Sequence, residues 1–539
     1  MGQEATGTDS GRPDAPAARA DQLPLAHEEM TLGIRLSRDG PVSDAHNLLL
    51  LAADSLRTTD ADRSREAGVH AVLAAWSGGD RDGCLAALDT LCPEDRPREG
   101  TSRADHDPVE TFWRGYRDGM RGVLRGDFER AATLLRPVLD VLTARQEASR
   151  LLSAGTIALM LGDLGAARQV LGLALATARS ETTPMLLPRV LEHLAYAELR
   201  EGRYHQARVH AEAGLEAAAG RAQRNVTAGL SAVLALAASI AGDPATVATH
   251  ARSALRIAHA HGLSQARTLA EWARARADLG HGHAEHAAAR LAPLVQEGPR
   301  QGHFGLWMMA VPCYVEAAVL SGHDLGTGTG TGTDVELLID RYARWASLGA
   351  DPQAPAVVLR CRALVAGDER REDLFSAALA RHESVDSPYE HARTHLAYGM
   401  WLRRRRRPVE ARAQLRRAVM GFDQCGADVW TARADAELGA AGETPVAAPS
   451  IASGAAPLTL LTPQQLRIAR SVALGATNRE VARQLSISTR TVEYHLRNIF
   501  THLGVRSRTA LARCLGPDLS PTGRPDGSAG PPAVRTAPD

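Results

Sequence analysis

A glycine that recurs about every 40 residues constrains the fold of this chain more than any other feature. These glycines are Gly40, Gly79, Gly126, Gly162, Gly202, Gly242, Gly282, Gly322 and Gly367. An alanine often follows five residues later, as Ala167 and Ala207 do. A repeat of this length in a sequence rich in Ala, Leu and Arg is typical of stacked helical hairpins, each of which buries its apolar face only against its neighbours. We therefore expect an all-α helical-hairpin solenoid, the alternative being a generic all-α domain with chance glycine spacing.

Composition indicates where this array begins and ends. Both ends of the chain and one internal stretch are polar or rich in Pro, Gly, Ala and Ser, as linkers and disordered segments are. The predicted parts are a disordered N-terminus at 1–22, the array at 23–438, a flexible linker at 439–457, a small domain at 458–515 and a disordered tail at 516–539.

The small domain contains four short helical patterns, each with its own start signal. The clearest is Thr477 with Glu480 three residues later, the spacing of a capping box at the start of a short second helix. Ser488 can cap a longer third helix after a brief turn. A short helix, a turn and a longer helix form a helix-turn-helix unit, whose second helix lies in the major groove of DNA.

The charge of residues 461–515 supports DNA binding. They contain nine arginines and two acids, Glu480 and Glu493, which gives a net charge of +7. The whole chain has a net charge of zero, so the remainder carries −7. A basic module on a mildly acidic body is the electrostatic footprint of a phosphate-binding domain.

The third helix, expected from Thr489 to about His502, separates core positions from exposed ones. Spacings of four and three predict that Val492, Leu496 and Ile499 face the core. Other faces carry Thr489, Arg490, Glu493, Tyr494 and Arg497. The acid can accept from a cytosine amino group, the last arginine can bond a guanine edge, and the tyrosine can touch a thymine methyl or a phosphate. The alternative is an ordinary surface helix with scattered charges.

This stretch resembles the DNA-binding domain of LuxR-type transcriptional regulators. The matching residues are 461–462, 475–482, 485–488, 491–492, 495, 498–499, 503–505 and 508, about a tenth of the chain. The resemblance implies a four-helix domain whose third helix reads bases and whose fourth helps it dimerise. It makes Glu493, Tyr494 and Arg497 base-reading candidates. The phosphate-contact candidates that it implies are Thr477, Asn478, Arg479, Thr489 and Thr491.

Two positions depart from the family pattern. Gln464 and Gln465 stand where the family usually has Arg-Glu after its opening Leu-Thr-x. His502 and Leu503 stand where a Lys-Leu pair is usual. Neither pair lies on the expected reading face, so both bear on surface charge or domain contacts.

The array is TPR-like and resembles, in architecture, the sensor arrays of large LuxR-type and MalT-like regulators. Regulators of this kind carry an N-terminal ATPase, which we do not expect here. The chain has no lysine at all, so a P-loop lysine, a Schiff-base lysine and a lysine-dependent phospho-receiver are all missing.

Three weaker features of the sequence suggest ligand binding but have simpler structural explanations. The histidines His281, His283 and His286 suggest metal binding, but a solvated turn is the better interpretation. The Gly-Thr alternation at 326–333 is expected to be a flexible insertion and not a phosphate cradle. The five arginines at 403–407 suggest nucleic-acid contact, but a charged turn between helices is favoured. We expect no catalytic residues, no metal and no cofactor.

The sequence thus predicts a sequence-specific DNA-binding regulator of transcription, an activator by resemblance. Six scattered cysteines and the lack of a run of 18 apolar residues favour a cytoplasmic protein without a membrane span. The expected partners are double-stranded DNA with a two-fold operator bound by a homodimer, RNA polymerase, and an effector or protein on the array. The alternative is a TPR-like interaction scaffold with an accessory DNA-binding module.

Overall fold

The fold is known from a computed structural model, which divides into two compact units, Met1–Val446 and Ala447–Asp539. The structure describes residues 15–92, 107–180, 184–322, 335–349, 351–385, 387–443, 461–503, 505 and 508–515. Within these ranges all regular secondary structure is helical, so the all-α fold class is confirmed.

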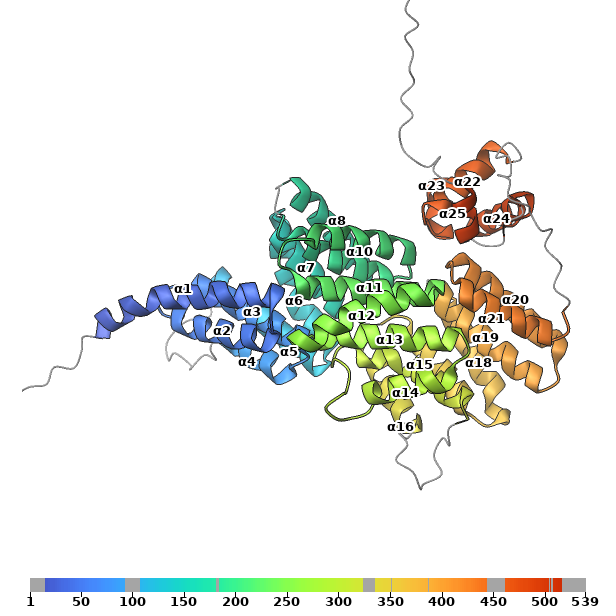
Figure 1. Ribbon diagram of the computed structural model, residues 1–539, viewed down its shortest axis with the longest axis horizontal. Coiled ribbons are helices and arrows are strands. Elements are labelled where there is room, and N and C mark those ends of the chain that lie inside the picture. The colour runs from blue at the N-terminus through green and yellow to red at the C-terminus, as the bar shows by residue number, and fades with distance from the viewer. Residues whose placement is uncertain are drawn as a thin grey trace, which may run out of the picture. The chain divides into compact units, whose positions relative to one another are not determined.

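The N-terminal unit is a row of helices in which consecutive members pair (Figure 1). Its first ten helices are α1 (Ala15–Asp39), α2 (Val42–Leu56), α3 (Ala61–Gly78), α4 (Arg81–Leu91), α5 (Pro108–Arg125), α6 (Phe128–Ala144), α7 (Ala148–Leu161), α8 (Leu164–Ser180), α9 (Leu187–Arg200) and α10 (Tyr204–Ala218). The others are α11 (Arg224–Ala241), α12 (Pro244–His261), α13 (Ser264–Gly280), α14 (Ala284–Val295), α15 (Trp307–Leu320), α16 (Val335–Ala346), α17 (Ala354–Val365), α18 (Asp368–His382), α19 (Pro388–Arg404), α20 (Pro408–Gln424) and α21 (Asp428–Ala440).

The periodic glycines end the first helix of successive hairpins. Left-handed backbone, with φ between +67° and +95°, occurs at Gly79, Gly126, Gly162, Gly202, Gly242, Gly282 and Gly322. A residue with a Cβ is disfavoured there, which explains why glycine recurs. Gly40 and Gly367 also lie between helices but do not have positive φ. In the glycine-free turn before α20, Arg406 itself has a φ of +59°.

Small residues let the two helices of a hairpin approach closely. A Cβ built on Gly155 of α7 would lie only 2.5 Å from Leu171 Cγ of α8. The same contact, between a glycine seven residues before the turn position and a leucine nine after it, joins Gly33 to Leu49, Gly119 to Leu135 and Gly399 to Leu415. The alanines that follow the turns, Ala45, Ala131, Ala167, Ala207, Ala287 and Ala411, are fully buried. The TPR-like helical-hairpin architecture is therefore built on close helix packing.

The array also closes on itself through α11, which contacts α1 as well as α9, α12, α13 and α21. Figure 1 shows this green helix between the blue N-terminal hairpins and the orange α19–α21. The Arg224 N–H and Nε both donate to Asp39 Oδ1, at 3.0 and 2.7 Å. Asn225 Nδ2 donates to the Gly40 carbonyl at 2.9 Å. Near the end of the array, Arg433 of α21 connects to the neighbouring α13, because its Nη1 donates to the Leu279 carbonyl at 2.8 Å.

α11 is also the one described helix long and apolar enough to cross a membrane by length and composition, yet 72% of that stretch is buried. Its neighbours in the array account for that burial, because α11 packs against helices on several sides. A helix of the hydrophobic core can have the same composition as a membrane span, so the burial of α11 is what identifies it as a core helix.

The predicted boundaries fall near element ends. α1 begins at Ala15, inside the segment 1–22 that was expected to be disordered, and α21 runs to Ala440, two residues beyond the predicted end of the array. Most of the predicted linker at 439–457, the tail at 516–539 and the Gly-Thr segment at 326–333 lie outside the described residues.

The five-arginine run forms a charged turn, as predicted. Three of its arginines bind acids of the array itself: Arg403 binds Glu437 at 2.8 Å, Arg405 binds Asp368 at 2.9 Å, and Arg407 binds Glu372 at 2.6 Å. These pairs hold α19 and α20 to α18 and α21.

Candidate nucleic-acid interface

In its described residues, the C-terminal unit holds four helices, α22 (Pro463–Ala473), α23 (Asn478–Gln484), α24 (Thr489–Leu503) and α25 (Arg508–Leu515). Thr462 opens the first with a complete capping box. Its hydroxyl accepts from the Gln465 N–H at 3.2 Å, and its own N–H donates to Gln465 Oε1 at 2.9 Å. Gln465, which replaces the usual acid, therefore completes the box with a neutral amide.

Thr477 and Glu480 form the predicted capping box of α23. The hydroxyl of Thr477 accepts from the Glu480 N–H at 3.3 Å, and Glu480 Oε2 accepts from the Thr477 N–H at 2.8 Å. The same hydroxyl donates to Glu480 Oε2 at 3.0 Å. The Thr477 hydroxyl thus both accepts and donates at the start of α23.

A tight turn sets α24 against α23. Ser486 has left-handed backbone with a φ of +53°, and the Ile487 N–H returns to the Ala482 carbonyl at 2.9 Å. Ser488 Oγ then accepts from the Thr491 N–H at 3.0 Å and caps α24, as predicted. A short helix, a turn closed by its own hydrogen bonds and a 15-residue helix make up the helix-turn-helix.

One apolar core fixes the orientation of α24. Val492 and Ile499 are fully buried and Leu496 is 5% exposed, which confirms the three positions predicted to face inward. They pack with residues of all four helices, among them Ile468, Val472, Val481 and Leu511. Because this face is buried, the face that carries Glu493 and Tyr494 must turn outward.

Arg508 is the residue of this domain that sequence reasoning missed. It is 9% exposed at the start of α25, and its Nη1 donates to Asn478 Oδ1 at 2.9 Å. Its Nη2 donates to the Ala476 carbonyl. The sequence marks this arginine only as a match to the family pattern, because no local signal predicts its contact with Asn478, 30 positions earlier. It ties the fourth helix to the loop before the second.

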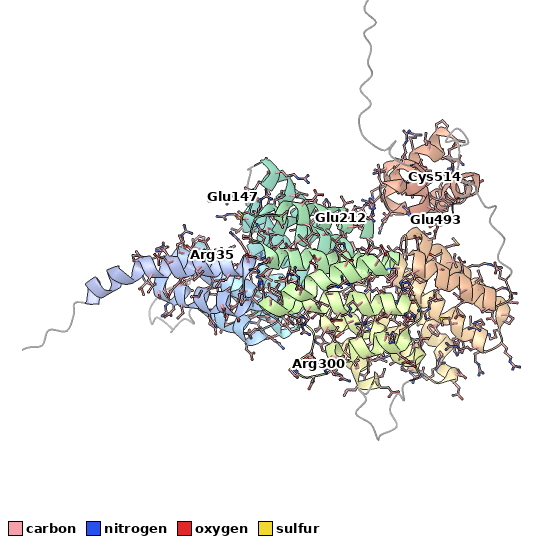
Figure 2. The ribbon with its side chains drawn as sticks, viewed as in Figure 1. Arg35, Glu147, Glu212, Arg300, Glu493 and Cys514 are labelled. Carbon is pink, nitrogen blue, oxygen red and sulfur yellow. The ribbon has the colours of Figure 1, made fainter. Side chains whose placement is uncertain are left out.

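The candidate DNA-binding residues gather on α24 and the start of α23. Tyr494 is 60% exposed and meets the His495 ring edge-on at 5.7 Å, while Glu493, labelled in Figure 2, is half-buried on the same helix. Thr489 and Arg479 are exposed, and Thr491 is half-buried with its hydroxyl 2.7 Å from Ser488 Oγ.

The remaining three candidates are Asn478, Arg490 and Arg497. Asn478 is half-buried, and its Oδ1 is the acceptor for Arg508, so its amide group is the part left for an anion. The side chains of Arg490 and Arg497 lie outside the described part of the structure. Their backbone is helical, and positions 490, 493, 494 and 497 share one side of α24 at 3.6 residues per turn.

Comparison with known proteins identifies this domain. Residues 459–515 match the family of bacterial regulatory proteins called the luxR family. The chain is 43% identical over 54 residues to a nitrate/nitrite response regulator protein homolog of Haemophilus influenzae, and 41% identical over 54 residues to the nitrate/nitrite response regulator protein NarP of Escherichia coli. These matches cover 10% of this chain and 26% and 25% of those relatives. The chain thus spans about a quarter of the length of the curated relatives it matches.

Two solved structures are similar over a larger part of the chain. A Rap protein complexed with competence and sporulation factor has a TM-score of 0.36 and 13% identity, covering 62% of this chain and 98% of its own. The apo form of RapI has a TM-score of 0.33 and 10% identity, covering 75% and 97%. Residues 459–515 are thus a LuxR-family helix-turn-helix domain, and the described residues before them form paired helices.

Proposed function

We propose that this protein is a sequence-specific, DNA-binding regulator of transcription that acts as an activator. The observation that carries the proposal is the exposed face of α24 in a LuxR-family domain with nine arginines and two acids at 461–515. The capped start of α23 and the turn at Ser486 fix the position of α24, so that this face stays outward. A preformed helix of this kind enters the major groove without paying for its own folding.

The two kinds of candidate residue have different roles in this proposal. Glu493, Tyr494 and Arg497 contact base edges from the outer face of α24, and thereby select sequence. Phosphates are contacted by Thr477, Asn478, Arg479, Thr489 and Thr491, and Arg490 is a further DNA-binding residue of α24. Phosphate contacts add affinity and fix the register, but carry no sequence information directly.

The remaining parts of the proposal concern assembly and control. Two copies bind a two-fold operator, because one helix-turn-helix covers only a half-site. The array senses an effector or binds a partner protein, and RNA polymerase is the partner at the promoter. The protein works in the cytoplasm, and it is not an enzyme.

A salt titration tests DNA binding. Fluorescence anisotropy of the C-terminal unit, residues 447–539, with genomic duplex fragments measures the affinity at each salt concentration. If a dimer neutralises six to ten phosphates, we expect the affinity to fall by about 10³-fold or more between 50 and 200 mM salt. Binding that is absent, or that does not change over this range, would refute the proposal.

A pair of alanine variants tests the role split. Glu493→Ala should relax the preference at one base pair by about 1–3 kcal/mol, because it removes an acceptor for a base donor. Arg479→Ala should weaken binding to all sequences about equally and reduce the salt slope by about one. Arg416→Ala, an exposed residue of the array, is the control. Identical loss patterns for the first two variants across an operator library would contradict the assignment.

A further inference from the structure

The array contains a partly open cavity of about 90 Å³. Most of its walls come from α9, α11, α13, α15, α17 and α19, and α10 and α16 contribute one tyrosine each. Aromatic and charged side chains line it, among them Tyr204, Trp272, Arg276, Tyr342, Tyr389 and Glu390. It lies where the array closes, since Gln353, another lining residue, donates to the Arg200 carbonyl across 153 residues of sequence at 3.2 Å.

Arg276 is the unusual member of this wall. It is 6% exposed, yet in the described part of the structure its guanidinium has neither an ion pair nor a hydrogen bond, and its Nε is buried without a partner. The guanidinium lies over two rings, 4.3 Å from the centroid of Trp272 and 5.7 Å from that of Tyr389. Stacking compensates part of its charge but none of its five donors.

The other buried charges near the cavity are paired with one another. Arg360 Nη2 binds Glu390 Oε2 at 2.6 Å, and Arg393 binds both Glu390, at 3.4 Å, and Glu316. Arg433 completes the group at 3.6 Å from Glu316. Burial alone would raise the pKa of Glu390, but Arg360, Arg393 and Arg276 lower it to about 2. Arg200 and Asp351 also line the cavity, so five arginines (Arg200, Arg276, Arg360, Arg393 and Arg433) face three carboxylates (Glu316, Asp351 and Glu390), and two positive charges are in excess.

A second buried donor lies beside Arg276. Tyr389 is 2% exposed, and its hydroxyl makes no hydrogen bond to any residue that the structure describes. Its ring packs edge-on against Tyr204 at 6.0 Å and against Trp430 at 5.8 Å, which fixes where the hydroxyl lies. Buried donors without partners are rare in folded proteins, and each costs free energy until an acceptor reaches it.

We propose that this cavity binds a small oxyanion, a carboxylate or a phosphate, which accepts hydrogen bonds from Arg276 and Tyr389. A planar guanidinium donates to either group in a bidentate manner, and the anion offsets the excess positive charge. The cavity of about 90 Å³ has room for several water molecules, and therefore for a group the size of acetate or phosphate. The inference rests on the proposed role of the array as a sensor, and it names the class of effector.

Thermal unfolding and calorimetry of the full chain test this. The probes are acetate and inorganic phosphate, with chloride at the same ionic strength as the reference. A ligand at about 100 times its Kd should raise the Tm of the array by about 2–3 °C, and whichever probe does so identifies the head group. If neither probe shifts the Tm or gives heat of binding, the proposal is overturned.

Two variants and a control locate the site. Arg276→Met should weaken anion binding by about ten- to a hundredfold, and Tyr389→Phe by about two- to tenfold, because a charged and a neutral hydrogen bond are lost. Arg276→Met keeps an unbranched side chain over Trp272 and Tyr389, and its circular dichroism spectrum and Tm in chloride alone show whether the array still folds. Arg416→Met, at an exposed ion pair, should respond to anions as the wild type does.

An unchanged anion response in both variants would overturn the assignment of the site. DNA binding, measured by anisotropy on the same preparations, separates the two proposals. A chain that binds operator DNA but no anion refutes only the effector site, whereas one that binds anion but no DNA refutes only the regulator.

Discussion

The buried arginines of the array and the exposed arginines of the C-terminal domain are placed in opposite ways. Arg360 in the array is 1% exposed and binds Glu390 at 2.6 Å, and Arg393 is 2% exposed between two glutamates. In the C-terminal domain Arg467, Arg470, Arg479 and Arg483 are exposed, and the domain has only two acids. The same residue type therefore holds helices together in one unit and supplies a surface charge in the other.

The difference teaches that arginine content alone does not indicate a nucleic-acid surface. A desolvated guanidinium needs nearby carboxylates, and its free energy is then tied to the fold. An exposed guanidinium contributes little to the fold and remains available to phosphates. The five-arginine run at 403–407 shows the point, because acids of the array bind Arg403, Arg405 and Arg407.

The largest effect that we expect is a loss of the array's stability in acid. Burial lowers the pKa of His303 and His395 to about 4 and that of His382 to about 3, so these histidines are neutral in the fold. A lowered pKa means that the unfolded chain binds protons first, so their stability contribution is full above pH 6.5 and is lost as the pH falls toward 4. At pH 5 the loss is about 2 kcal/mol for each histidine.

Thermal unfolding at pH 7 and pH 5, followed by circular dichroism, measures this loss. The ion pairs of Glu390 should persist at both values, because its pKa is about 2. A Tm of the array that is the same at pH 7 and pH 5 would show that these histidines are solvated or already charged. His303→Gln keeps a polar group at one of the three positions and should remove its share of the pH dependence.

Removing one buried carboxylate should have the next largest effect. Glu316 is 8% exposed and faces both Arg393 and Arg433, so Glu316→Ala leaves one buried and one half-buried cation with one partner fewer. We expect a loss of about 3–5 kcal/mol in the unfolding free energy of the array. Glu66→Ala breaks an exposed pair with Arg63 and should cost less than about 1 kcal/mol. Equal losses in urea titrations would show that burial does not distinguish the two pairs.

A buried arginine of the C-terminal domain sharpens the comparison with a smaller effect. Arg508→Met keeps the apolar stem but removes the bonds to Asn478 and to the Ala476 carbonyl. We expect a loss of about 1–3 kcal/mol in the stability of residues 447–539, because the carbonyl is left without this donor. Arg467→Met, at an exposed position of α22, should be nearly neutral. If both variants unfold at the same urea concentration as the wild type, Arg508 does not hold α25 in place.

Local signals in the sequence predicted the helices, the turns and the inward face of α24. Turn glycines, capping boxes and spacings of three and four act over a few residues, so Gly162, Thr477 and Val492 could be assigned from their neighbours alone. The closure of the array could not be predicted in this way. Contacts such as Asp39 with Arg224 depend on the small rotation added at each hairpin, which no single repeat encodes. Arg276 looked like any other arginine for the same reason, since its surroundings come from several hairpins.

The hydrogen bonds between Asp39 and Arg224 can form only late in the synthesis of the chain. The two residues are 185 positions apart, so α1 leaves the ribosome long before its partner helix exists. At about 5–20 residues per second the delay is roughly 10–40 s. During that time the surface of α1 that later meets α11 is open to solvent and to other nascent chains. The first hairpins must therefore resist aggregation on their own. The contact between α1 and α11 can form only after α11 has been synthesised.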